Sequence, residues 1–124
     1  AVTDVTGFGL AGHALEMAEG SGATIAIDSG SVPLLPEALH FASFGFLTGG
    51  GSSNLQYVEP SLAVDGSLSR EMRMVLHDPQ TSGGLLIAVP EDRVAALATA
   101  PISRLPSAVP PKMVALQKLL TRPR

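Results

Sequence analysis

The chain has 124 residues, 45% of them hydrophobic, and a formal net charge of −3, which suits one small domain and argues against a nucleic-acid-binding surface. Cysteine is absent, and this excludes disulfides, thiolate metal sites and a cysteine nucleophile. The apolar runs of the chain are far shorter than the roughly 20 residues of a membrane-spanning helix. The amino terminus lacks the pattern of a signal peptide, so we expect a cytoplasmic protein.

The first informative segment is Thr3-Asp4-Val5-Thr6-Gly7-Phe8-Gly9-Leu10, which stands just ahead of a predicted helix. Asp4 can ligate a hard cation, and the glycines let the backbone approach a ligand closely. The positive end of the helix dipole would favour an anion nearby. The alternative is that Asp4 or a threonine simply caps the helix, which would stabilise it by roughly 0.5–2 kcal/mol.

Hydrophobic periodicity predicts that helix from about Gly7 to Glu19. One half of its wheel is apolar, while His13 and Glu16 fall on the polar half, where a neutral or ion-paired structural histidine is expected. The glycines around Ser21 should end the helix. A strand is then predicted from Ala23 to Asp28, because that segment alternates and is rich in β-branched residues.

The middle of the chain is predicted to be less regular. After a turn at 29–31, the proline-started segment 33–44 predicts a short helix. The segment 45–54 is rich in glycine and serine and reads as a flexible loop, followed by an extended piece at 55–58. Its glycine run lacks the Gly-Lys-Ser/Thr end of a Walker A loop, so a P-loop is excluded.

The last predicted elements are a helix at 69–76, a turn at 78–84, a strand at 85–89 and a helix at 91–99. The turn, Asp78-Pro79-Gln80-Thr81-Ser82-Gly83-Gly84, could line a nucleotide or could be a tight buried connection, and for Asp78 we favour the structural role. This alternation of short strands and helices predicts an α+β domain with a mixed sheet.

Residues 101–124 differ in composition from residues 1–100. They hold five of the eight basic residues and no acidic one, together with half of the ten prolines. We therefore predict two parts, a domain at 1–100 and a divergent, proline-rich, basic tail at 101–124. Within the tail only Lys112 to Leu120 has a helical pattern.

The two polar glycine-containing motifs together resemble the selenophosphate synthetase (selenide, water dikinase) family, in its C-terminal, AIR-synthase-like domain. That family has Ala/Cys-x-Asp-Val-Thr-Gly-Phe-Gly-Leu-x-Gly-His and, later, Asp-Pro-Gln-Thr-Ser-Gly-Gly-Leu, and both occur here in that order. Asn54 and the glycines near it also look like the family. The resemblance covers about residues 1 to 95, and it implies a domain that is incomplete at both ends.

The resemblance implies an ATP-dependent reaction in which selenide, ATP and water give selenophosphate, AMP and phosphate, with Mg²⁺ holding the polyphosphate. Asp4 matches the position at which the family's C-terminal domain lends a carboxylate to the metal cluster. Thr3 and Thr6 are weaker candidates that could donate hydroxyls to phosphate, although threonines at this place are often caps. No catalytic residue is assigned.

The family's reactive cysteine or selenocysteine, its lysine and its other metal-binding aspartates belong to an amino-terminal domain that this sequence does not include. We therefore expect the chain alone to bind ATP weakly and to be inactive, and we expect a homodimer only for the full-length protein. Two alternatives stay open: another member of the AIR synthetase-like group of ATP-binding enzymes, or a non-catalytic dimerisation or regulatory module.

Overall fold

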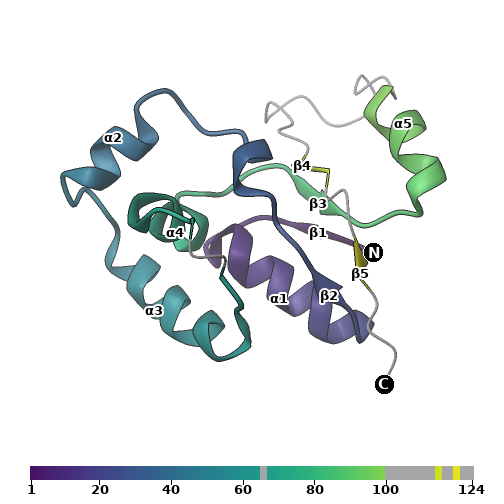
Figure 1. The fold of residues 1–124 in the computed structure, drawn as a ribbon, viewed down its shortest axis with the longest axis horizontal. Helices are drawn as coiled ribbons and strands as arrows, with labels where there is room; N and C mark the ends of the chain where they lie inside the picture. The colour runs from purple at the N-terminus through teal and green to yellow at the C-terminus, as the bar shows by residue number, and fades with distance from the viewer. Residues whose placement is uncertain (65–66, 100–113, 116–118, 121–124) are drawn as a thin grey trace.

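A computed structural model of the chain describes residues 1–64, 67–99, 114–115 and 119–120, and Figure 1 shows its fold. Helices pack around small sheets, as the α+β prediction requires. The elements in chain order are β1 (Val2–Asp4), α1 (Gly9–Ser21), β2 (Thr24–Ile25), the 3₁₀ turn η1 (Ser29–Ser31), α2 (Ala38–Ser43), α3 (Gly49–Val58), the 3₁₀ turn η2 (Glu59–Ser61), α4 (Arg70–His77), β3 (Leu85–Ile87), α5 (Glu91–Thr99), β4 (Val114–Ala115) and β5 (Leu119–Leu120).

The main sheet has the strand order β1-β3-β4 and is mixed, which confirms the predicted sheet type. β1 runs antiparallel to β3, with Asp4 opposite Leu85, and β4 runs parallel to β3. β2 and β5 form a separate antiparallel pair. The helix predicted for Lys112 to Leu120 is therefore wrong for the four residues of β4 and β5, and its other residues lie outside the described part of the chain.

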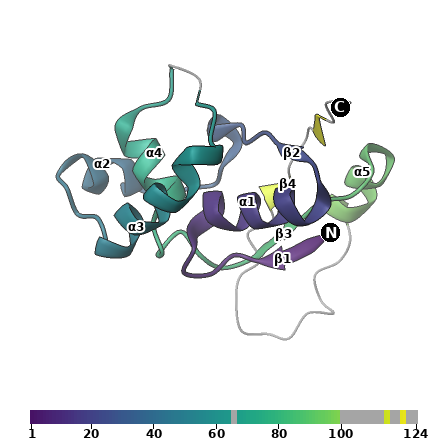
Figure 2. The same cartoon turned by 90° about the horizontal axis from the view of Figure 1, so that it is seen from below.

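α1 covers one face of β1 and β3, and Figure 2 shows it lying along the two strands. α3 and α4 pack against α1, and α2 packs against α4. The core between these elements is formed by Val5, Leu10, Ala11, Ala14, Met17, Val32, Val58, Leu76 and Leu86. Within the described residues, no helix has the length and apolar character that crossing a membrane requires.

α1 begins and ends about two residues later than predicted. Gly22 ends it in the left-handed conformation (φ 59°), and its N–H donates to the carbonyl groups of the last turn, so the predicted glycine stop is confirmed. His13 lies beside Glu16 as predicted, with 3.0 Å between its Nδ1 and the carboxylate, but the residue is only 8% exposed, so this part of the predicted polar half is buried. Its ring is covered edge-on by Phe8, with 5.9 Å between the ring centroids.

The glycine-rich segment predicted as a loop forms the first turns of α3, and the predicted extended piece forms its end. Thr48 caps this helix, because its hydroxyl accepts a hydrogen bond from the Gly51 N–H at 3.3 Å. A Cβ atom on Gly50 would lie 2.8 Å from the Pro79 side chain. The glycines therefore allow α3 to pack closely on the 78–84 turn, and packing overrides their low helix propensity.

The remaining elements agree with the predictions in type, and some of them differ in their bounds. The 91–99 helix and the turn at 29–31 are confirmed, and the 69–76 helix is confirmed with Ser69 as its cap. The 33–44 helix is reduced to α2, which follows Glu37 in a left-handed conformation (φ 64°). β2 and β3 are likewise shorter than the predicted strands.

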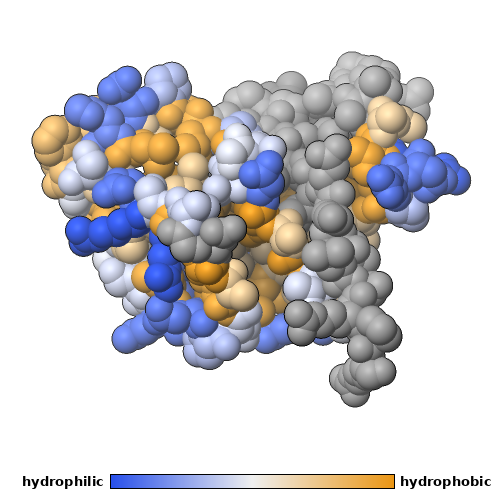
Figure 3. All heavy atoms as spheres, viewed as in Figure 1, coloured by the Kyte–Doolittle hydropathy of each residue, from blue (hydrophilic) through white to orange (hydrophobic). Residues whose placement is uncertain are grey.

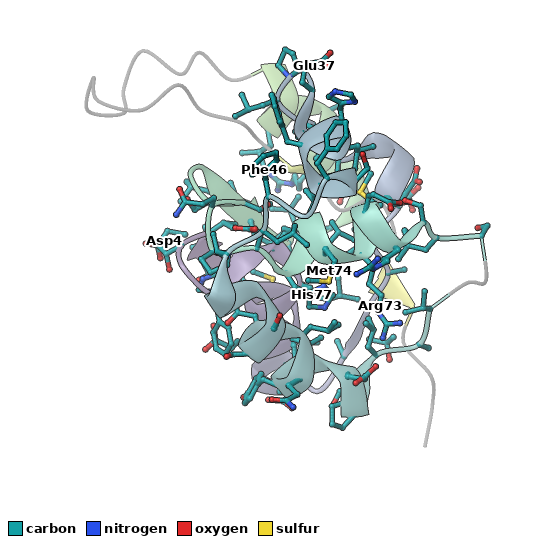
Figure 4. The ribbon with its side chains drawn as sticks, turned by 90° about the vertical axis from the view of Figure 1, so that its left-hand side faces the viewer. Asp4, Glu37, Phe46, Arg73, Met74 and His77 are labelled. Carbon is teal, nitrogen blue, oxygen red and sulfur yellow. The ribbon has the colours of Figure 1, made fainter. Side chains whose placement is uncertain are left out.

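His77 is a buried histidine of the core and gives the fold a pH dependence. It is the last residue of α4, its side chain lies inside the molecule, as Figure 4 shows, and the residue is 1% exposed. Nδ1 contacts the Arg73 carbonyl oxygen at 2.6 Å, and Nε2 has no partner among the described residues. Protonation would therefore place an unpaired buried N–H at Nε2, and burial lowers the pKa of His77 below its ordinary value of 6.5.

The unfolded state thus binds more protons than the folded state as the pH falls below about 6.5. We expect the free energy of unfolding to decrease with falling pH there, by up to about 1.4 kcal/mol per pH unit from this group. Urea unfolding between pH 7.5 and 5, compared with His77→Gln, measures the contribution. An identical slope in the variant would show that the dependence comes from other groups.

Candidate functional site

Asp4 is the last residue of β1 and its side chain is exposed. Figure 4 places it at the periphery of the molecule, away from His77 in the interior. Within the described residues its carboxylate has neither a hydrogen-bond nor an ion-pair partner. The capping alternative is wrong, because α1 begins at Gly9 and its N-cap is Phe8, which makes no side-chain cap.

The two sequence motifs are hydrogen-bonded to each other, and this pairing fixes the backbone around Asp4. Val5 donates its N–H to the Gly84 carbonyl oxygen at 3.1 Å, and Gly83 donates to the Val5 carbonyl oxygen at 2.7 Å. Both glycines have positive φ, 96° at Gly83 and 84° at Gly84, which side-chain-bearing residues rarely adopt. The second motif is thus the structural partner of the first.

Gly9 brings the start of α1 against the end of α4. Its φ is +72°, and a Cβ atom there would lie 2.9 Å from the backbone carbon of His77. The same atom would lie 3.1 Å from the backbone oxygen of Asp78. Only glycine therefore allows the loop after Asp4 to sit this close to the chain that enters the second motif.

Asn54, on α3, joins the first motif to the end of α4 through one side-chain nitrogen. Its Nδ2 donates to the Gly7 carbonyl oxygen at 3.0 Å and to the His77 carbonyl oxygen at 2.9 Å. From the sequence, this residue shows a likeness to the family and no role of its own. The one asparagine in a segment rich in glycine and serine could have indicated a structural role. Because the segment was predicted to be a loop, no such role was assigned.

Replacing Asn54 with alanine removes both hydrogen bonds and leaves the His77 carbonyl, which is partly buried, without this donor. We expect the free energy of unfolding to fall by about 1–3 kcal/mol. The exposed Gln56 lies on the same helix, and Gln56→Ala provides the matched control with an expected change within about 0.5 kcal/mol. Urea unfolding of both variants measures the difference, and equal losses would contradict the bridging role.

Asp78 is buried, at 8% exposure, and its carboxylate is used within the fold. Oδ1 accepts from the Gln80 N–H at 2.8 Å and from the Thr48 hydroxyl at 3.3 Å, while Oδ2 accepts from the Thr48 N–H at 3.4 Å. These contacts hold the turn and tie it to the start of α3. Asp78 therefore has the structural role that we favoured from the sequence.

The two threonines near Asp4 have different surroundings. Thr3 is half-buried and its hydroxyl donates to the Asp4 carbonyl oxygen at a long 3.4 Å. Thr6 is exposed, and its hydroxyl lies 3.0 Å from Nε2 of His13, whose Nδ1 lies 3.0 Å from the Glu16 carboxylate. Thr6 is two residues from Asp4, so their Cα atoms are at most about 7 Å apart.

A magnesium ion could use Asp4 only as one ligand among several. The described residues contain no group of three or more histidine, aspartate or glutamate side chains arranged to hold a metal. An exposed, unpaired carboxylate nevertheless fits Mg²⁺, which commonly takes one or two protein carboxylates and completes its octahedron with water and phosphate. Asp4 therefore fits a magnesium site whose other ligands come from elsewhere. The described residues do not fit a site in which this chain supplies all the ligands.

A separate groove of about 290 Å³ lies between α2 and the second motif. Its walls are mostly apolar and include Phe41 and Phe46, and the turn at 80–83 forms the polar end. Apolar side chains are also exposed around α2, as Figure 3 shows. Asp4, Thr3 and Thr6 are not among the residues that line this groove.

The fold and the paired motifs agree with the comparison to known families. Residues 1–114 match the family described as AIR synthase related protein, C-terminal domain, and the chain belongs to this family.

Three similar proteins are named selenide, water dikinase, one of them with the number 2. Over 89 residues the chain is 52% identical to a selenide, water dikinase of Clostridium botulinum (strain Eklund 17B / Type B), which covers 72% of this chain and 26% of that protein. It is 44% identical over 97 residues to selenide, water dikinase 2 of Peptoclostridium acidaminophilum, covering 78% and 28%. It is 50% identical over 91 residues to a selenide, water dikinase of Porphyromonas gingivalis (strain ATCC 33277), covering 73% and 26%. The chain thus spans about a quarter of the length of these relatives, and the sequence-based resemblance is confirmed.

Proposed function

We propose that this chain is the part of a selenide, water dikinase that contributes Asp4 to a magnesium and polyphosphate site. In the proposed reaction, selenide, ATP and water give selenophosphate, AMP and phosphate. The observation that carries the proposal is the exposed, unpaired carboxylate of Asp4, held in place by the pairing of the two motifs.

Phosphoryl transfer is promoted mainly by positioning and by neutralisation of charge. Asp4 stands at the end of a strand whose register with β3 is fixed, so its carboxylate is presented from a rigid element. When bound, Mg²⁺ would supply positive charge against the polyphosphate oxygens. The remaining ligands of such a site would come from ATP, from water and from other parts of the full-length protein.

In this proposal the other motif residues hold the backbone around Asp4 in place. Asn54 and Gly9 keep the loop after Asp4 against the end of α4, and Asp78 keeps the second motif folded. Thr3 and Thr6 stand beside Asp4 in the sequence, and of these Thr6 is the more exposed residue. ATP, selenide and Mg²⁺ are the proposed ligands of the full-length protein, which we propose to be a homodimer.

The test is the product pattern of the full-length protein supplied with Mg²⁺ and ATP, followed by ³¹P NMR with and without selenide. We expect selenide-dependent formation of AMP, phosphate and a selenophosphate resonance. Formation of ADP, or ATP cleavage at the same rate without selenide, would contradict the proposed function.

A further inference from the structure

The face around α2 exposes apolar side chains that the proposed function does not use. Five of them are between 38% and 72% exposed, and we call them the α2 patch: Leu35, Leu39, Phe41, Phe44 and Phe46. Glu37 and His40 are the only ionisable side chains of residues 32–48. Single exposed apolar residues are common in soluble proteins, but a group of them with so little charge marks an interaction surface.

The backbone and the ring contacts hold the α2 patch in one arrangement. Phe46 donates its N–H to the Phe41 carbonyl oxygen at 3.2 Å, and the centroids of these two rings are 6.1 Å apart. Thr48, which follows the patch in the sequence, contacts the Asp78 carboxylate through both its N–H and its hydroxyl. Because the patch is ordered in this way before anything binds, covering it costs little conformational entropy.

The groove between α2 and the second motif adjoins the α2 patch, since Phe41 and Phe46 belong to both. Val5 and Leu10 of the hydrophobic core also line this groove. A side chain that enters it would therefore contact the core itself. An aromatic, charge-poor surface beside a polar edge, here the turn at 80–83, has the composition that is typical of the centre and rim of a protein interface.

The comparison with the relatives indicates what covers this face. The chain is 44–52% identical to proteins of which it spans only 26–28%, so about three quarters of such a protein lies outside this domain. The matching family is itself described as a C-terminal domain. Interfaces between domains of one chain bury roughly 600–1,500 Å², and an ordered apolar face with a groove suits an interface of this kind.

We propose that the α2 patch and the adjoining groove bind a part of the full-length protein that lies outside residues 1–124, within the same polypeptide chain. The bound surface is apolar where it meets Phe44, and it inserts a side chain into the groove. Leu85 lines the groove and pairs with Asp4 in the sheet, so docking here brings that part to the end of the sheet that carries Asp4. This inference requires only the length of the relatives, and it can hold even if the proposed reaction is wrong.

Photocross-linking in the full-length protein tests the proposal directly. We expect Phe44→p-benzoylphenylalanine to cross-link to a peptide outside residues 1–124, and a mixture of ¹⁵N-labelled and unlabelled protein shows whether both peptides come from one chain. The control is the same replacement at Glu19, which is exposed on α1, does not line the groove and should give no cross-link to that peptide. A cross-link to residues 100–124, a cross-link between labelled and unlabelled chains, or no cross-link at all would overturn the proposal.

Hydrogen exchange in the full-length protein gives an independent readout. Phe44→Asp places a charge in the covered face, so amide exchange of residues 38–47 should become faster by roughly 10-fold or more. Phe44→Leu keeps an apolar side chain and should change it by less than about two-fold. Exchange in α1 should be equal in all three proteins, because Phe44 is 66% exposed within this domain. Unchanged exchange at 38–47 in Phe44→Asp would overturn the proposal, and if α1 is disturbed as well, the cross-linking, which keeps an aromatic side chain, decides.

Discussion

Replacing Asp4 with asparagine in the full-length protein is expected to weaken Mg²⁺-dependent ATP binding by about 100-fold or more. The substitution keeps the size of the side chain and removes the charge that a hard cation requires. Because the carboxylate is exposed and has no partner within the described residues, its loss should leave the fold intact. The free energy of unfolding should therefore change by less than about 0.5 kcal/mol.

Calorimetric titration of ATP with Mg²⁺ and with chelator measures this effect, and urea unfolding checks the fold. Asp92→Asn is the matched control, because Asp92 is an exposed aspartate of α5 that makes a loose contact of 3.8 Å with its neighbour Arg93. The control should bind like the unaltered protein. Equal Mg²⁺-dependent affinities for Asp4→Asn and the unaltered protein would remove Asp4 from the proposed site.

Replacing Gly9 with alanine is expected to be the most destabilising small substitution in the first motif. The left-handed conformation at φ +72° costs a side-chain-bearing residue roughly 1–2 kcal/mol. The new Cβ would also meet three backbone atoms of His77 and Asp78 at 2.9 to 3.1 Å, and a forced backbone shift adds roughly 1–3 kcal/mol. We expect a loss of about 2–5 kcal/mol, a large share of the stability of a small domain.

Gly20→Ala provides the control on the same helix. Gly20 is exposed, and nothing lies within 4 Å of a Cβ atom built there. Alanine should therefore stabilise the helix by about 0.5–1 kcal/mol through the entropy of the unfolded chain. Urea unfolding midpoints measure both changes. A loss at Gly9→Ala no larger than 1 kcal/mol would show that the contact with His77 relaxes easily.

The sequence predicted helices well where local chemistry determines them. The 91–99 helix has the predicted bounds, and Ser69 caps α4 as a serine before a helical pattern should. The prediction failed at the start of α3, because three successive glycines disfavour a helix locally. The contacts of α3 with α1, α4 and Pro79, together with the Thr48 cap, stabilise the helix there.

The site could be predicted only in part, because it too depends on contacts between distant parts of the chain. Both motifs stand out in the sequence, but nothing in it indicates that Val5 pairs with Gly83 and Gly84, or that Asn54 holds Gly7 and His77 together. These contacts join residues far apart in the chain. The roles of Asp4, Thr3 and Thr6 in metal and phosphate binding remain predictions.

The pairing of β1 with β3 has a consequence for how the protein is made. Ala88 donates its N–H to the carbonyl oxygen of Ala1, and these residues are 87 positions apart. At a translation rate of roughly 5–20 residues per second, the ribosome needs roughly 4 to 20 seconds to make the partner strand. During that interval the segment that carries Asp4 has no strand to join, so the site is assembled late in biosynthesis.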